Sequence, residues 1–194
     1  MSSRTYTQSA RAASTESTRR AVVAAAQSLI VEDENFDPSL EQIAEHADVS
    51  VRTVLRHFGS KEGVVEAAIA DAAARINAER AAVPGDSATA IRRLVNHYEG
   101  SGDQTMRMLA EAERSDVIRQ ITDSGKDFHR AWAEATFAPW LEGLPRAARA
   151  ERVARIASLT DVYMWHLLRR RYGLSRKQTE TAIRELVETE GEMR

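Results

Sequence analysis

Residues 39–61 constrain the fold of this 194-residue chain more than any other stretch. They read SLEQIAEHADVSVRTVLRHFGSK, and their apolar residues recur at helical rather than strand spacing. In the first half, this spacing is kept by Leu40, Ile43, Ala44 and Ala47. In the second half, Val54 and Phe58 lie four residues apart, and Asp48 and Val49 fall between the two apolar sets. The stretch therefore predicts two short amphipathic helices joined by a tight turn.

Local signals predict where both helices begin and end. Ser39 precedes the first helix as an N-cap, and Gln42, three residues later, completes a capping box. Ser50 takes the same position before the second helix, which is expected from Ser50 to about Phe58. Gly59 ends that helix, because glycine tolerates a left-handed backbone, and Ser60 caps the next one. Asp48 is also tolerated in a left-handed turn.

The second helix is too polar on one side to be simply buried. Its polar surface is formed by Arg52, Thr53, Arg56 and His57, beside Val51. Such a helix is typical of a helix-turn-helix whose second helix enters the DNA major groove. Many all-α proteins, however, contain polar helical hairpins that bind no nucleic acid. From this pattern alone, an all-helical protein-interaction module without specific DNA binding stays an alternative.

The stretch from about Thr18 to Ile69 resembles the N-terminal domain of the TetR family of transcriptional regulators, over about a quarter of the chain. The matching elements, in order, are Arg20–Ala26, Asn35-Phe36, Ile43-Ala44, Val49-Ser50, Thr53–Phe58 and Ser60-Lys61-Glu62. The resemblance implies an all-α fold, in which a helix-turn-helix DNA-binding domain precedes a larger helical ligand-binding and dimerisation domain. Two positions depart from the family pattern: Leu55 stands where Tyr is common, and Asp48 stands where Gly is common.

The resemblance also implies roles for individual residues. Val51, Arg52 and Thr53 are expected at base edges or at the groove wall. Arg52 is expected to read a base, since Arg bonds guanine through two hydrogen bonds. Phosphate contacts are expected from Ser50, Arg56, His57 and Lys61, with Arg19 and Arg20 on the flanking backbone. Leu55 is not expected to make the phosphate contact that the family's Tyr makes.

The charge distribution favours this interpretation more than the net charge of −2 does. Residues 1–20 carry Arg4, Arg11, Arg19 and Arg20 against one acidic residue, Glu16. Together with Arg52, Arg56 and Lys61, they predict a basic face on an acidic molecule. Arg-rich tails are often only solvated, so a role for Arg4 and Arg11 stays open.

Composition excludes several other classes of protein. Gly and Pro are few, at 9 and 4 residues, which favours helices, and the absence of Cys excludes disulfides and thiolate metal sites. The five His include no pair four residues apart, so no metal site is expected. No phosphate-binding glycine loop or catalytic motif is present, and we predict neither an enzyme nor a cofactor. No apolar stretch reaches membrane-spanning length, and the N-terminus lacks a signal-peptide core, which predicts a soluble, cytoplasmic protein.

Gly and Pro residues that end helices, and Ser residues that cap them, predict about nine helices and two domains. Residues 1–14 are expected to form a disordered basic arm. A DNA-binding domain is expected at 15–66, with the helix from about 60 as connector, and a ligand-binding and dimerisation domain at 67–194. Expected helices outside the hairpin are 15–31, 60–83, 87–99, 103–113, 115–141, 146–172 and 175–190.

Apolar stripes in the last two expected helices predict a homodimer interface, which the family resemblance also implies. The residues are Val153, Ile156, Thr160, Tyr163, Leu167, Ile183, Leu186 and Val187. The same stripes would also suit the core of one subunit, so both uses stay open. A dimer is required functionally, because one short helix contacts few bases whereas a two-fold dimer reads two half-sites.

Large apolar side chains between the expected helices predict a pocket for a small-molecule effector. The candidates are Tyr98, Met106, Phe128, His129, Trp132 and Tyr163. Aromatic residues at helical spacing usually form ordinary core, so this alternative stays open for each of them. An apolar or aromatic effector is favoured over a multiply charged one, because no cluster of Arg or Lys accompanies these residues.

The mechanism implied by the resemblance is that of a ligand-responsive regulator, most simply a repressor. The ligand-free dimer binds a palindromic operator. The effector stabilises a state in which the second helix of each subunit's hairpin no longer fits into successive major grooves. The helix from about 60 to 83 joins both domains and is the expected coupling element.

Overall fold

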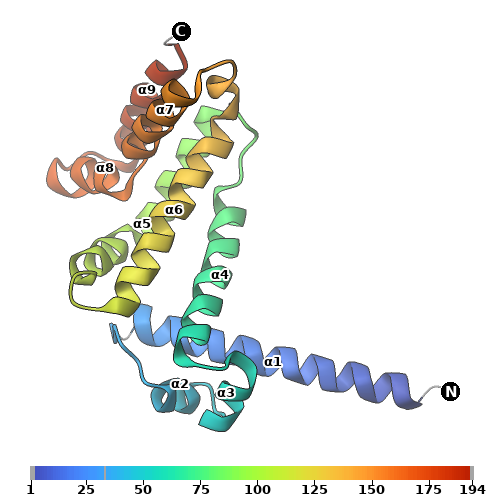
Figure 1. Cartoon of the computed structure of the whole chain (residues 1–194). Coiled ribbons are helices and arrows are strands. Elements are labelled where there is room, and N and C mark those ends of the chain that lie inside the picture. Colours follow the sequence, from blue (N-terminus) through green and yellow to red (C-terminus); the bar gives the residue numbers. More distant parts are fainter. Residues whose placement is uncertain (1–2, 33, 193–194) are drawn as a thin grey trace. The chain divides into compact units, whose positions relative to one another are not determined.

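The computed structural model describes residues 3–32 and 34–192, and within these ranges the chain forms helices and no strand (Figure 1). The predicted all-α fold is confirmed for this part of the chain. The chain divides into two compact units, Met1–Ala72 and Ala73–Arg194, which we call the N-terminal and C-terminal units. The division falls inside helix α4 (Lys61–Arg80), so one helix contributes residues to both units.

The N-terminal unit packs α1 (Ser3–Val31), α2 (Leu40–His46), α3 (Val51–Phe58) and the first part of α4 around one small core. The side chains of α1 that enter the core recur every three to four residues, which makes one face of that helix apolar. The buried core consists of Val22, Val23, Ala25, Ala26, Leu29, Ile43, Ala44, Val54, Val64 and Ala68. This core fixes the hairpin of α2 and α3 against α1.

Helix α1 is longer than the sequence analysis predicted. It begins at Ser3, whereas a helix over 15–31 after a disordered arm was expected. The stretch from Ser3 to Val31 contains neither Gly nor Pro and is rich in Ala and Arg, so nothing in it interrupts a helix. The arm expected at residues 1–14 is therefore helical from residue 3 onward, and residues 1–2 lie outside the described part.

The C-terminal unit contains the end of α4, α5 (Ser87–Glu111), α6 (Asp116–Thr136), α7 (Arg146–Leu159), α8 (Val162–His166) and α9 (Arg176–Glu192). A short 3₁₀ helix, η1 (Ala138–Leu141), follows α6, and a π-helical turn, η2 (Leu167–Arg171), extends α8. Helix α5 lies at the centre, because it contacts α6, α8 and α9. Its inward face, with Ile91, Leu94, Val95 and Tyr98, enters a core that Trp132, Phe137 and Trp165 complete.

The predicted break between the helices expected over 87–99 and 103–113 is wrong, because α5 runs through Gly100-Ser101-Gly102 to Glu111. The separate helix expected over 103–113 is part of α5. Gly102 is buried against the indole of Trp165, and a Cβ added at this position would overlap that ring. The glycine therefore permits close packing between α5 and α8 and does not end a helix.

The single helix expected over 146–172 is also wrong, since α7 ends at Leu159 and α8 begins at Val162. Thr160 is the C-cap of α7, and the Asp161 carboxylate accepts a hydrogen bond from Tyr163 N at 2.9 Å as the N-cap of α8. The helix expected over 115–141 ends at Thr136 instead. Pro139 lies in the 3₁₀ turn that follows, where it lacks the N–H that an α-helix would need.

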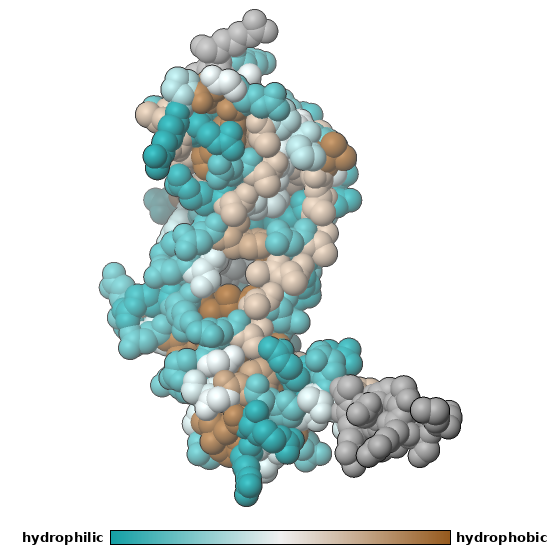
Figure 2. All heavy atoms as spheres, turned by 45° about the vertical axis from the view of Figure 1, so that its right-hand side comes forward, coloured by the Kyte–Doolittle hydropathy of each residue, from teal (hydrophilic) through white to brown (hydrophobic). Residues whose placement is uncertain are grey.

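Hydrophilic side chains predominate on the face shown in space-filling form, and strongly hydrophobic atoms form separate small patches there (Figure 2). Among the described residues, no helix is both long and apolar enough to cross a membrane.

Candidate nucleic-acid interface and effector grooves

The turn between α2 and α3 has the predicted local chemistry. The capping box is present, since Ser39 Oγ accepts from Gln42 N at 3.2 Å and Gln42 Oε1 accepts from Ser39 N at 2.8 Å. Asp48 adopts a left-handed backbone with φ of 53°, as the sequence analysis anticipated. The N–H of Val49 donates to Ala44 O at 2.9 Å and closes the turn. These bonds hold the start of α3 in one orientation relative to α2.

Both ends of α3 are capped as predicted. Ser50 Oγ accepts from Thr53 N at 3.2 Å and also lies 2.9 Å from Thr53 Oγ1. One hydroxyl hydrogen of the pair is used between them, which leaves the other for an external acceptor such as a phosphate. At the other end, Gly59 has φ of 78°, and the Ser60 hydroxyl accepts from Gly63 N at 3.2 Å to start α4.

Helix α3 separates its residues into a buried side and an exposed side. Val54 is fully buried, and Val51 and Phe58 pack against the core of the N-terminal unit. Arg52 and Arg56 are exposed, with Leu55, which is 40% exposed, between them. Neither guanidinium has an ion-pair partner among the described residues. An uncompensated basic face on a rigid helix suits a polyanion.

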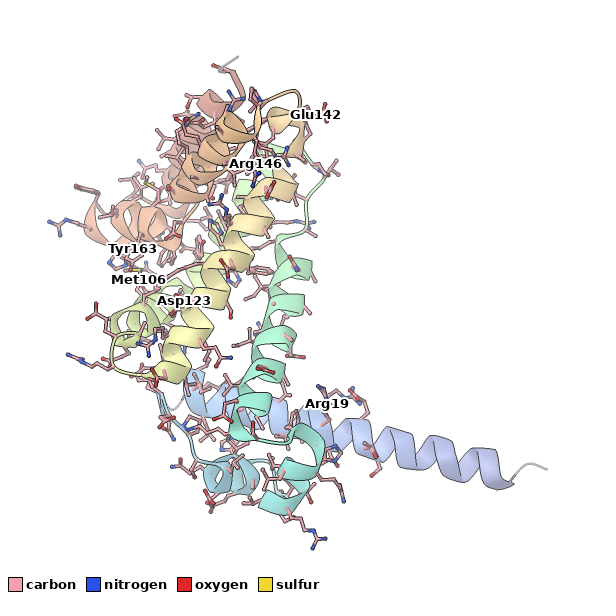
Figure 3. The ribbon with its side chains drawn as sticks, viewed as in Figure 1. Arg19, Met106, Asp123, Glu142, Arg146 and Tyr163 are labelled. Carbon is pink, nitrogen blue, oxygen red and sulfur yellow. The ribbon has the colours of Figure 1, made fainter. Side chains whose placement is uncertain are left out.

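The other residues predicted to contact the DNA backbone differ in whether their side chains already have partners within the chain. Lys61 pairs with the Asp37 carboxylate. Arg20 lies 3.9 Å from Glu16 in an exposed pair. Arg19 places its guanidinium 5.3 Å from the centre of the Phe58 ring, which keeps it beside the end of α3 (Figure 3). His57 is half-buried, with its Nε2 atom enclosed and unbonded, so only its Nδ1 atom is available to a phosphate.

Comparison with known proteins agrees with this architecture. Residues 22–68, from α1 into α4, match the family model described as "Bacterial regulatory proteins, tetR family". The solved structure of a transcriptional regulator from Rhodococcus sp. Rha1 has a similar fold, with a TM-score of 0.59 and 18% sequence identity. The similarity covers 88% of this chain and 94% of that one. Among curated proteins, none matches the chain.

The capped hairpin with its basic second helix is the helix-turn-helix of a DNA-binding transcriptional regulator. Residues 22–68 match the DNA-binding region of the TetR family, a family of transcriptional regulators.

The residues predicted for the dimer interface separate into two groups. Val153, Ile156, Thr160, Ile183 and Val187 are each at most 2% exposed and form part of the C-terminal unit's own core. Of the two uses left open for these five residues, their burial within one chain fits the core of a single subunit. Tyr163, Leu167 and Leu186 are 52%, 41% and 42% exposed and are free to contact a second copy.

The predicted effector residues line two different grooves. One groove, of about 410 Å³, lies along the end of α4 and α6 and is lined by Phe128 and Trp132. The other, of about 530 Å³, is lined by His129 and Tyr163 together with residues of α7. Tyr98 and Met106 line neither, and Tyr98 is buried, with its hydroxyl donating to Thr160 O at 3.1 Å. A single pocket containing all six residues is not formed.

His129, which lines the larger groove, is held in its neutral form. Burial lowers its pKa, and the nearby Arg80 guanidinium lowers it further. Its Nε2 lies 3.1 Å from both Ala157 O and Thr160 Oγ1, so the neutral ring carries its proton there and donates it. Its Nδ1 atom is buried and has no hydrogen-bond partner in the described part of the chain.

The sequence analysis missed Arg80, which lines the smaller groove and is only 5% exposed. As the last residue of α4, it looks in sequence like an ordinary basic helix end. No signal in the sequence distinguishes a buried arginine at this position from a solvated one.

Proposed function

We propose that the chain binds a palindromic operator as a homodimer and represses transcription until a small effector releases it. The observation that carries the proposal is the exposed basic side of α3 on a hairpin whose ends are all capped. Only eight residues form α3, so one copy contacts few bases. Two copies related by a two-fold axis would read inverted half-sites in major grooves of the same DNA.

In this proposal, each residue of the basic face has a distinct role. Arg52 reads a base edge, and Val51 and Thr53 contact the base edges or the groove wall. Phosphate contacts come from Ser50, Arg56, His57 and Lys61, with Arg19 and Arg20 on the flanking backbone. The rigid caps support this assignment, because a base-reading helix must hold its side chains in register.

The dimer forms through the exposed apolar side chains of α8, η2 and α9. Tyr163, Leu167 and Leu186 are large apolar residues that the C-terminal unit leaves exposed. Exposed apolar residues of this kind are typical of an interface between subunits. Leu186→Asp would test this surface, since a charge there should shift the chain from dimer to monomer in analytical ultracentrifugation.

The effector acts through α4 in this scheme. Val64 and Ala68 of α4 belong to the core of the N-terminal unit, and Arg80 is buried in the C-terminal unit. A change at the C-terminal end of a continuous helix is therefore passed to the DNA-binding hairpin. The functional division is a DNA-binding domain at 15–66 and a sensor domain at 67–194. Because the operator lies on the chromosome, we place the protein in the bacterial cytoplasm.

Selection of bound sequences from a random duplex pool, at two salt concentrations, tests the proposal. An enriched inverted repeat that is lost more readily at high salt would support a dimeric operator binder, because phosphate contacts release counterions. No enrichment at either salt would contradict it and would favour the all-helical protein-interaction module.

A further inference from the structure

Arg80 is a buried cation without a charged partner. Arg80 is only 5% exposed, and its Nε atom has no hydrogen-bond acceptor among the described residues. Among the described residues, no ion pair includes Arg80. Removing a guanidinium from water without a paired anion is unfavourable, and proteins rarely accept this arrangement without a reason.

The neighbours of Arg80 only partly compensate its charge. The guanidinium carbon lies 5.0 Å from the Tyr98 ring centre and 5.9 Å from that of Trp132, within cation–π distance. The nearby carboxylates have other partners. Glu79 Oε2 lies 3.0 Å from His97 Nδ1, and Asp161 caps α8 through Tyr163 N. Both carboxylates favour the charged form of Arg80, but among the described residues neither forms an ion pair with it, so a bound anion would be the first carboxylate in direct contact with the guanidinium.

The groove beside Arg80 has the size and lining of a small-ligand site. Its volume is about 410 Å³, within the range of common ligand pockets. Phe128, Trp132 and Pro84 provide apolar surface, and Asn77 and Thr136 provide polar atoms. Among the described residues that line it, Arg80 alone carries a formal charge. One positive charge beside aromatic surface matches a monoanion better than a dianion.

We propose that this groove binds a small carboxylic acid, with its carboxylate on Arg80 and its apolar part along Phe128 and Trp132. A carboxylate matches the planar guanidinium fork and can accept two parallel hydrogen bonds from it. The inference rests on the proposed function, because it assigns the chemical class of the effector. The bound effector would also contact α4 directly, since Arg80 is the last residue of that helix.

Matched acid and amide probes test this inference on the full chain. Calorimetry and thermal unfolding would compare benzoate with benzamide, 2-naphthoate with 2-naphthamide, and octanoate with octanamide. At least one acid should bind the wild-type chain more tightly than its amide. In Arg80→Met that acid should bind roughly 10- to 100-fold more weakly, because bonds to a charged group are lost. Arg130→Gln, an exposed arginine on the other groove, should leave binding unchanged.

Two further variants keep the outcome clear. Arg80→Lys retains the positive charge but not the planar guanidinium fork, and it should reduce the affinity for the acid by an intermediate factor. If Arg80→Met fails to fold, Arg80→Lys and Arg80→Gln take its place. The inference is overturned if every acid binds wild type no better than its amide, or if the acid preference survives in Arg80→Met.

DNA binding is measured separately, so that the two proposals can fail independently. Fluorescence anisotropy on the selected operator would be repeated with and without the preferred acid. Acid binding through Arg80 without any change in operator affinity would support the anion site and contradict the ligand-responsive part of the proposed function. Release of the operator by the acid from wild type, but not from Arg80→Met, would support both.

Discussion

The arginines of the two units differ in what surrounds them. On α3 of the N-terminal unit, Arg52 and Arg56 are exposed and have no carboxylate partner among the described residues. In the C-terminal unit, ion pairs connect neighbouring helices, as in Arg149–Glu134, Arg155–Glu190, Arg169–Glu99 and Arg170–Asp103. Arg80 breaks the pattern of its unit, since it is buried and unpaired. Exposed arginines of that unit such as Arg130 also lack an ion pair among the described residues, so burial is what distinguishes Arg80, whereas Arg52 and Arg56 are distinguished by their place on the second hairpin helix.

The largest expected effect follows from removing an unpaired arginine of α3. Arg52→Ala should weaken operator binding by about 1–3 kcal/mol and relax the preference at one symmetric pair of positions. Unfolding by urea should be nearly unchanged, because the side chain is exposed. Anisotropy titrations against the operator and its single-base variants measure the effect. An unaltered base preference would remove Arg52 from the readers.

Removing a paired acid should instead affect stability. Glu99 accepts hydrogen bonds from Arg169 and also from Trp165 Nε1, and the bond from Arg169 is the main cause that lowers the pKa of Glu99 to about 2. Glu99→Gln should lower the free energy of unfolding by about 1–2 kcal/mol at pH 7, after allowing for partial solvent exposure. Glu142→Gln, an exposed position, is the matched control.

The pH dependence of that difference has a defined sign. Because the folded pKa of Glu99 is depressed, the stabilisation is complete above the ordinary value of 4.5 and is lost as pH falls toward 2. The gap between wild type and Glu99→Gln should therefore shrink over this window in urea titrations. A gap that stays constant from pH 7 to pH 3 would show that the carboxylate charge contributes nothing.

A smaller effect is expected at Lys61, for which we propose a phosphate contact. Lys61→Ala should weaken binding to all duplex sequences about equally and reduce the slope of log affinity against log salt by about one. The measurement is anisotropy on operator and random DNA at several salt concentrations. Selective loss on the operator alone would instead indicate a base contact.

The smallest effect is expected from removing the Asp37 carboxylate that pairs with Lys61. Asp37→Asn should release the ammonium and tighten binding to any duplex by up to about fivefold, since exposed pairs contribute little. Glu45→Gln on α2 removes an exposed acid of the same unit that forms no ion pair with any described residue, and it controls for the general change in charge. Equal effects of the two substitutions would show that the Asp37–Lys61 pair is irrelevant to DNA binding.

The hairpin could be predicted from sequence because its determinants are local. The capping box at Ser39, the left-handed Asp48 and the terminating Gly59 each depend on a few neighbouring residues, and all three are confirmed. The predictions were wrong where contacts between residues distant in sequence determine the length of a helix. Gly102 reads as a helix breaker until the ring of Trp165 is placed against it. The first residues of α1 are rich in Ser and Thr, which is typical of a disordered arm, but they contain no residue that breaks a helix.

The effector site was less predictable for the same reason. The four-residue spacing of Phe128 and Trp132 places them on one face of a helix, and both line the smaller groove. The burial of Arg80 depends on α5 and α6, which lie far from it in sequence, and spacing carries no information about it. The stripe of Val153, Ile156, Ile183 and Val187 shows the same limit, because periodicity marks an apolar face but does not say what covers it.

Methylation interference on the selected operator tests the central claim most directly. The claim is that α3 reads base edges in the major groove as part of a two-fold dimer. The account predicts that methylation of guanine N7 blocks binding at two symmetric sets of positions, and that Arg52→Ala becomes insensitive to one guanine in each set. Interference at a single set, or the same pattern in wild type and Arg52→Ala, would contradict it.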